Sequence, residues 1–363
     1  MEKNSLELKQ KVVYIFRHLD AMYLFCNEMV RDHGKRAILR FFFIQIDNLL
    51  KLAGRLKNLL VADGSLKGGA RLEVEAAVAA LRGTYDGSFD LIRDKFTAHA
   101  QLVDLGQAVE WWASIDYSTI EILYDEVKRI EVALKASKHM EFVPIGADYG
   151  PLTVPSWNAL SPHFQEFHFD AGRLALASSG AVGVLFGAPV QQKAQLIVST
   201  LDLIRFDFAL TCLVENYETR YKAYLFDAGW LLAFVDACAL IDNLFAHSAH
   251  DGASLLEQWE AEGFGGYRLL KGLDSGRDSK FEAELRVMRN KIGAHLDADT
   301  PFRELHEDFV AFNLQNLIAY AHWLANGFLN ACRQDVRTKM FAAHGMGLAG
   351  VTALATTPRP FDA

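Results

Sequence analysis

RNKIGAHLD (residues 289–297) and RDKFTAHA (residues 93–100) share one pattern, and that pattern organises the interpretation of the whole chain. Each stretch begins with Arg, followed by an amide or carboxylate residue and then Lys. The fourth residue after the Lys is His, and an Ala precedes that His. A second element, IDNL, occurs at 46–49 and again at 241–244. The IDNL elements are 195 residues apart and the Arg-His motifs 196 apart. Two landmarks in the same order with almost the same spacing indicate an internal repeat.

Length and composition are those of a globular protein with more than one domain. The chain has 363 residues, of which 51% are hydrophobic and 23% charged. Such a composition supports real cores and is unlike that of a disordered chain. The net charge of −8 argues against a broad basic surface that grips nucleic acid non-specifically. It leaves room for a small positive pocket that binds one phosphate.

The four cysteines are far apart and form no C-x-x-C pair, so we expect free thiols in a reducing, cytoplasmic environment. We expect no metal and no cofactor, because no His, Cys and carboxylate cluster has the spacing of ligands. The charged start MEKNSLELKQ does not resemble a signal peptide. Two stretches without charged residues, 174–192 and 340–357, contain too many Gly and small polar residues for a membrane span. We therefore expect no membrane partner.

Helical periodicity dominates the chain on both sides of an irregular centre, and it predicts an all-α fold. The helices expected in the first half cover about 4–31, 35–60, 72–103 with an interruption at 83–87, and 115–137. Those expected in the second half cover about 190–217, 219–248, 278–298 and 302–331. Each half is therefore interpreted as a four-helix unit, with IDNL on the second helix and the Arg-His motif on the third.

The domain organisation follows from this pattern. Between the two halves, several Pro and Gly residues interrupt any helix and indicate an irregular connector. The expected parts are an N-terminal helical domain (1–140), the connector (141–189), a C-terminal helical domain (190–335) and a tail (336–363).

The motif helices place Arg and His on either side of one apolar stripe when they are drawn as ideal helices. In the second half the stripe consists of Leu285, Met288, Ile292 and Leu296; in the first half it consists of Phe89, Ile92, Phe96 and Ala100. An Arg and a His six residues apart are separated by about 120° on an ideal helix, so they flank the face instead of touching. If the two faces met in a two-fold arrangement, Arg and His from both halves would surround the contact.

Two histidines and two arginines in one cluster would suit a specific chemistry. Imidazoles have an unperturbed pKa near 6.5 and can act as base and acid at neutral pH. Guanidinium groups bind phosphate oxygens and stabilise the extra charge of a five-coordinate phosphorus. Such a site could cleave RNA without a metal, through attack of the ribose 2′-OH on the adjacent phosphate. DNA lacks that hydroxyl and would not react.

Two four-helix units that each carry an Arg-polar-x4-His motif on the third helix resemble tandem HEPN domains. RNKIGAH fits the signature of that family, and RDKFTAH is similar to variants in abortive-infection-type members. The resemblance implies an internal pseudo-dimer with a ribonuclease site at its interface, RNA as a partner, and a toxin, phage-defence or RNA-processing role. The residues that match the family motif are Arg93, Asp94 and His99 in the first half and Arg289, Asn290 and His295 in the second.

Several alternatives remain open at this point. Asp94 stands where the second half has Asn290, and its carboxylate could neutralise Arg93. The Tyr that often follows the His in family members regulated by a nucleotidyltransferase is absent. The chain could thus be a non-catalytic module that binds a nucleotide, RNA or protein partner, or a helical scaffold. It could also form a homodimer or bind a regulatory protein.

Asp47 and Asp242, at equivalent places in the two IDNL elements, are further candidates. From the second helix of each half they could orient the motif Arg or His. The alternative interpretation is that they are solvated or capping residues.

Overall fold

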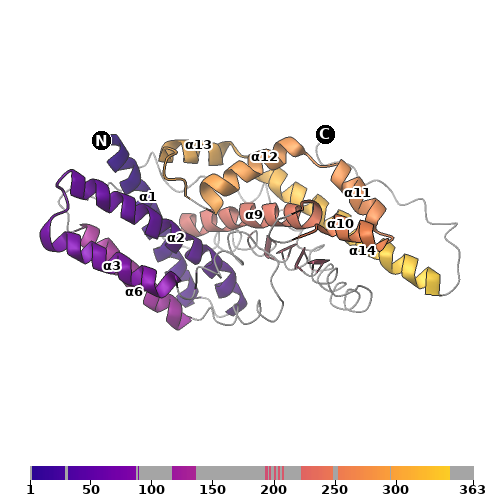
Figure 1. The fold of residues 1–363 in the computed structure, drawn as a ribbon, viewed down its shortest axis with the longest axis horizontal. Helices are drawn as coiled ribbons and strands as arrows, with labels where there is room; N and C mark the ends of the chain where they lie inside the picture. The colour runs from indigo at the N-terminus through magenta and orange to yellow at the C-terminus, as the bar shows by residue number, and fades with distance from the viewer. Residues whose placement is uncertain are drawn as a thin grey trace. The chain divides into compact units, whose positions relative to one another are not determined.

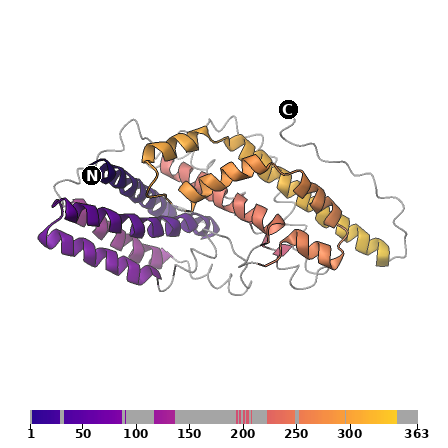
Figure 2. The same cartoon turned by 45° about the horizontal axis from the view of Figure 1, so that its top comes forward.

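A computed structural model describes residues 2–28, 32–86, 89, 117–135, 222–247, 252–294 and 296–343, and isolated positions between 193 and 207. The elements of these described segments are all helices (Figures 1 and 2). The expectation of an all-α fold is therefore confirmed. The finer arrangement, tandem bundles packed as a pseudo-dimer, stays a prediction.

The described chain forms two compact units, and each unit draws on separate stretches of sequence. The first contains residues 1–154, 206–235 and 286–312; the second contains 155–205, 236–285 and 313–363. The motif RNKIGAH belongs to the first unit, with the N-terminal helices. The expected domains 1–140 and 190–335 stay a prediction.

Four long helices form the N-terminal part of the first unit: α1 (Glu2–Glu28), α2 (Asp32–Ala62), α3 (Gly68–Asp86) and α6 (Tyr117–Lys135). α1 packs along α2 and α3 along α6, while α2 also contacts α3 and α1 contacts α6. α3 and α6 lie side by side in both views (Figures 1 and 2). Four consecutive buried residues in the middle of α2, Phe41 to Ile44, show that this helix is covered on all sides. A helix with apolar residues all round is stable only in such a position.

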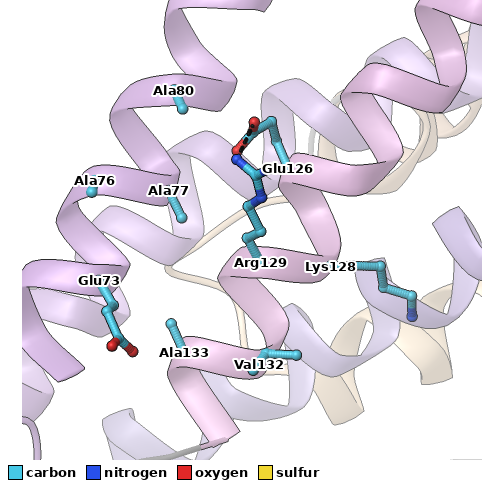
Figure 3. Close-up of a pocket in the computed structure, with 9 residues that line it drawn as sticks. All are labelled: Glu73, Ala76, Ala77, Ala80, Glu126, Lys128, Arg129, Val132 and Ala133. Atoms are coloured by element: carbon cyan, nitrogen blue, oxygen red, sulfur yellow. Dashed lines mark hydrogen bonds and ion pairs between the residues drawn. The ribbon is translucent and has the colours of Figure 1, made fainter.

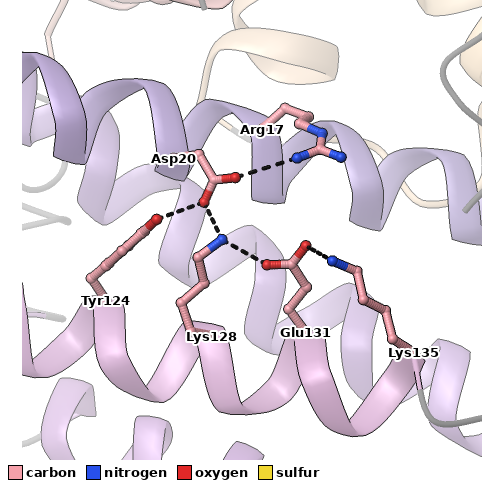
Figure 4. Close-up of polar contacts among 6 residues, drawn as sticks. All are labelled: Arg17, Asp20, Tyr124, Lys128, Glu131 and Lys135. Carbon is pink, nitrogen blue, oxygen red and sulfur yellow. Dashed lines mark hydrogen bonds and ion pairs between the residues drawn. The ribbon is translucent and has the colours of Figure 1, made fainter.

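A polar network joins α1 to α6 beside this core (Figure 4). Asp20 is buried and accepts hydrogen bonds from Tyr124 Oη at 2.8 Å and Lys128 Nζ at 2.5 Å. Lys128 also contacts Glu131 at 2.7 Å, and Lys135 contacts the other oxygen of Glu131 at 2.7 Å. Burial alone would lower the pKa of Lys128, but its bonds to the two carboxylates raise that pKa overall. Both carboxylates of the network, those of Asp20 and Glu131, are therefore paired with a lysine.

α9 (Lys222–Phe245) is the most apolar of the described helices, and its residues belong to both units, 222–235 to the first and the remainder to the second. Residues Asp227–Phe245 are long and apolar enough to cross a membrane, yet 89% of this segment is buried inside the protein. Asp227 and Asp236 are among its buried residues. A mostly buried apolar helix with carboxylates along it has the character of a core helix in a globular protein.

The second unit contains α10 (Leu255–Glu262), α11 (Tyr267–Ser275) and α14 (Leu314–Ala343), and most of α12 (Ser279–Met288). Ser254 and Glu257 form a capping box at the start of α10, which satisfies two of the free N–H groups of that end. Trp259 is fully buried between Phe264 and Phe328, and α11 packs along α14.

A buried carboxylate connects α12 to α14 within this unit. Glu282 accepts from Arg277 Nε at 2.8 Å and Nη2 at 2.5 Å, a two-point contact, and it also accepts from the Tyr320 hydroxyl. The Arg277 guanidinium lies 4.9 Å from the centre of the Phe245 ring. Burial and the bond to Glu282 raise the pKa of Tyr320. These residues form a satisfied structural ion pair.

The observed helices differ from the expected ones at three places in the second half. α10 and α11 lie in the stretch from 249 to 277, for which no helix was expected. The expected helix 302–331 is two helices, α13 (Phe302–Ala311) and α14, separated by an extended Phe312. The expected α-helix 278–298 ends at Met288 and continues as a π-helical turn, η3 (Arg289–Gly293). The second and third expectations were wrong because apolar periodicity continues across the break.

Candidate functional site

The π-helical turn coincides with the second copy of the motif. It begins at Arg289 and ends at Gly293, where the Ala294 N–H donates to the Arg289 carbonyl at 2.7 Å. The Asp297 N–H then reaches back to the carbonyl of Lys291 at 2.9 Å. A π-turn holds about one residue more than an α-turn, so the angular spacing of an ideal α-helix does not apply to residues 289–293. Short π-turns inside helices occur frequently at functional sites.

The small residues of the motif allow this turn to lie against α9. A Cβ atom on Gly293 would lie 3.1 Å from the Leu231 carbonyl oxygen and 3.3 Å from a methyl carbon of Val235. Ala294 is fully buried and clusters with Val235. The Gly-Ala pair of RNKIGAH is thus explained by close backbone packing.

Arg289 and Asn290 lie together at the start of the turn. Arg289 is half-buried and donates from Nη1 to Oδ1 of the exposed Asn290 at 3.0 Å. The expected apolar stripe beside it is confirmed, because Leu285, Met288, Ile292 and Leu296 are all buried. An amide accepts a hydrogen bond and leaves the charge of the guanidinium intact, whereas a carboxylate would compensate it. The side chains of Arg289 and Asn290 are thus joined at the first turn of η3.

Lys291, the third residue of the motif, connects the turn to α13. Its Nζ lies 3.2 Å from Asp308 and 3.4 Å from Glu304. The hydrogen bond to Asp308 is the main reason why the pKa of Lys291 is raised. The Lys of the motif is thus engaged by two carboxylates of α13 and contributes to holding the turn.

Residues far away in the sequence hold the segment after the turn, and sequence reasoning missed them. Asn48, within the first IDNL, accepts the Leu296 N–H at 3.1 Å. Lys11 of α1 donates to the carbonyls of Asp297, Ala298 and Thr300. The repeat of IDNL was a signal for Asn48, whereas the predicted site residue was its neighbour Asp47. For Lys11 the sequence contained no signal.

The remaining predicted site residues are distributed as follows. Asp47 Oδ2 accepts from Lys51 Nζ at 2.7 Å, one turn along α2. Asp242 lies on α9 in the second unit, where its carbonyl accepts from the Ala246 N–H. Their role towards the motif stays a prediction. Arg93, Asp94, His99 and His295 lie outside the described residues.

A second titratable cluster is buried in the first unit. His18 has no solvent exposure and packs against the rings of Tyr14, Phe41 and Tyr224. Its Nε2 lies 3.8 Å from Oδ2 of the buried Asp227, and the Tyr14 hydroxyl donates to the same oxygen at 3.3 Å. Neither ring nitrogen of His18 has a hydrogen-bond partner among the described residues. Burial lowers the pKa of His18 to about 3, so the ring is neutral at pH 7.

An open groove of about 580 Å³ runs between α3 and α6 (Figure 3). It is lined by four alanines, one valine and four charged residues, and two of the charged residues, Glu126 and Arg129, form an ion pair at 2.9 Å. The residues that line it are Glu73, Ala76, Ala77, Ala80, Glu126, Lys128, Arg129, Val132 and Ala133. None of them belongs to the motif, so the groove is not assigned to the candidate site.

Within the described segments, no group of three or more His, Cys, Asp or Glu side chains is arranged to hold a metal ion. Comparisons of the chain with protein-family models, with curated proteins and with solved structures found no match.

Proposed function

We propose that this chain is a metal-independent endoribonuclease of HEPN type, with a composite site built from both copies of the motif. The observation that carries the proposal is the duplicated R-[DN]-K-x-x-A-H, in register with the duplicated IDNL. A toxin or phage-defence effector in the cytoplasm is the role that such an activity would serve.

The geometry of the second motif supports this proposal. The motif residues do not continue a regular helix but form a π-turn, with half-buried Arg289 and exposed Asn290 next to each other. A guanidinium can bind phosphate oxygens and stabilise negative charge in the transition state. The turn is also connected through Lys291 to α13, and catalytic geometry requires such rigid support.

The proposed reaction uses one histidine as base and the other as acid. One of His99 and His295 removes the proton of the ribose 2′-OH, and the 2′-oxygen forms a bond to the adjacent phosphorus. The bond from phosphorus to the 5′-oxygen breaks, and the other histidine donates a proton to that oxygen. The products are a 2′,3′-cyclic phosphate and a 5′-hydroxyl end. Arg93 and Arg289 stabilise the charge on the five-coordinate phosphorus.

The charge of the chain restricts the substrate. A net charge of −8 does not attract long RNA by electrostatic steering. We therefore propose a structured target such as a tRNA loop, or an RNA that a protein partner delivers, because shape and a few phosphate contacts suffice to bind such a target.

A second candidate function is a non-catalytic HEPN-like module that binds a nucleotide, RNA or a protein partner. The observation in its favour is Asp94, which stands where the second copy has Asn290. A carboxylate next to Arg93 would weaken binding of a phosphate at that copy.

Cleavage of tRNA or total RNA in the presence of EDTA tests the proposed function. Wild type should produce fragments with 2′,3′-cyclic phosphate ends and leave DNA of the same sequence intact. His99→Ala and His295→Ala should each lower the cleavage rate by about 100-fold or more, as expected for the loss of a general acid or base. The fragment ends are identified by enzymatic treatment and gel mobility.

His247→Ala is the matched control, because His247 is exposed and contacts Glu257 in the second unit. Its cleavage rate should equal that of wild type. No cleavage by wild type, or equal cleavage by wild type and both motif variants, would refute the ribonuclease. Binding of RNA without cleavage would favour the second candidate function, a non-catalytic module that binds RNA.

A further inference from the structure

Lys11 makes an unusual contact for a lysine, because its charged end is buried and surrounded by backbone oxygens. Its Nζ donates to the carbonyls of Asp297 at 2.6 Å, Ala298 at 3.0 Å and Thr300 at 2.5 Å. An ammonium group has three N–H donors, and here each has a carbonyl partner. Burial lowers the pKa of Lys11, while the nearby Asp297 and Glu7 counteract this.

Asn48 and Glu7 bind the backbone just before and just after the residues that Lys11 contacts. Asn48 is buried, and its Oδ1 accepts the Leu296 N–H at 3.1 Å, while its Nδ2 has no hydrogen-bond partner among the described residues. Glu7 Oε2 accepts the Phe302 N–H at 2.8 Å, at the first residue of α13. Backbone groups of residues 296–302 thus bond to side chains of α1 and α2.

This arrangement determines the conformation of the segment. Residues 296–301 form no regular helix. Their backbone N–H and C=O groups therefore make few of the intrahelical hydrogen bonds that would pair them in a helix. Buried backbone N–H and C=O groups need partners, and here Lys11 and Asn48 provide four of these bonds. We call Lys11 and Asn48 together the backbone anchor.

We propose that the backbone anchor positions the motif turn for catalysis, with Lys11 and Asn48 as positioning residues that do not contact the substrate. The inference rests on the proposed function. The turn Arg289–Gly293 is connected to the anchored segment by the bond from Asp297 N to Lys291 O. A shift of the anchored backbone is therefore transmitted to the motif, and a displacement of about 1 Å can cost 100-fold in rate.

The test compares kcat, KM and amide hydrogen exchange of variants on one short RNA that wild type cleaves. Lys11→Met removes the three donors and retains the length of the side chain; Asn48→Leu removes the acceptor together with the unpartnered Nδ2. Each variant should lower kcat by about tenfold or more with KM within about twofold, because substrate contacts remain. Peptides covering 296–300 should exchange faster than in wild type. Lys11→Arg, which keeps the charge and N–H donors, should recover part of kcat.

Lys128→Met is the matched control. It makes the same chemical change in the same unit, where Lys128 connects α6 to Asp20 of α1 instead of to the motif segment. It should lower thermal stability without lowering kcat. If Lys11→Met fails to fold, Asn48→Leu carries the same comparison.

The outcomes separate the two proposals. An inactive wild type refutes the proposed function and with it this inference. An active wild type whose kcat is unchanged by Lys11→Met and Asn48→Leu refutes the backbone anchor alone, as does an equal loss of kcat in Lys128→Met.

Discussion

Acidification from pH 7 to pH 4 should lower the free energy of unfolding by about 3 kcal/mol through His18 alone, given an unfolded pKa of about 6.5. The reason is that burial lowers the pKa of this histidine to about 3 in the folded protein. Between these two pKa values the unfolded chain binds a proton at His18 and the folded chain does not. Stability from this group is therefore complete above about pH 6.5 and falls as the pH decreases towards 3.

The surroundings of His18 explain why the neutral ring is favoured. Three aromatic rings, those of Tyr14, Phe41 and Tyr224, cover it. Asp227 Oδ2 lies 3.8 Å from Nε2 of His18, and this oxygen also accepts from the Tyr14 hydroxyl. Burial disfavours the imidazolium more than this single carboxylate at that distance favours it. Burial and Asp227 likewise raise the pKa of Tyr14, which stays protonated over the whole acid range.

Denaturant unfolding of wild type and His18→Leu at a series of pH values measures the effect. The stability difference between the two proteins should change by about 3 kcal/mol between pH 7 and pH 4, in favour of the variant at low pH. Phe43→Leu serves as control, since Phe43 is a buried ring of the same unit that packs on Phe89 and carries no titratable group, so its loss should shift stability equally at both pH values. If the free energy of unfolding had the same pH dependence in wild type and His18→Leu, His18 would not contribute to the loss of stability in acid.

Gly266→Ala should destabilise the second unit by about 3 kcal/mol, the upper range for overpacking a core. Gly266 precedes α11 with φ −75° and ψ −12°, a conformation that alanine adopts without strain. The cost comes from space alone: a Cβ atom would lie 2.2 Å from the Ala331 carbonyl oxygen and 2.7 Å from the Trp259 ring. A backbone oxygen of α14 cannot turn aside as a flexible side chain can.

Gly272→Ala is the matched control within α11. A Cβ atom at Gly272 would meet nothing within 4 Å, so alanine should stabilise the helix by about 0.5–1 kcal/mol. Thermal or denaturant unfolding measures both variants. If Gly266→Ala were as stable as wild type, α11 and α14 could separate without cost, and the close packing at Gly266 would not matter for stability.

Much of the fold could be predicted from the sequence, because an amphipathic helix requires apolar residues at a regular spacing of three to four positions. The apolar periodicity predicted α1 and α2 within a few residues, and it predicted the buried face of Leu285, Met288 and Ile292. It failed where the apolar pattern continues through a break. The chain VAFNLQNL leaves α13 at Phe312 and enters α14 with an Asn313 side chain that accepts from the Asn316 N–H. Asparagine is a favoured residue before the first turn of a helix, because its side chain accepts a free N–H of that turn.

The residues of the candidate site were predicted from the sequence and stay a prediction, whereas the local geometry around Arg289 could be predicted only in part. The duplicated motif drew attention to Arg289 and Asn290, and the structure places them in contact at the start of one turn. Gly293, the last residue of the π-turn, lies close to the Leu231 carbonyl of α9. Such a close approach depends on two segments that are far apart in the sequence, so no local sequence pattern predicts it.

The sequence by itself determined the all-α class, the repeat and the chemistry available to the motif, because periodicity and residue type act within a few turns of helix. Only the tertiary structure decided what holds the segment that follows the motif: Lys11 bonds to backbone oxygens 286 to 289 residues away, and Asn48 to an N–H 248 residues away. Backbone carbonyls and N–H groups are the same in every residue. Which of them a distant lysine or asparagine meets is therefore settled by packing and by the need to pair every buried polar group.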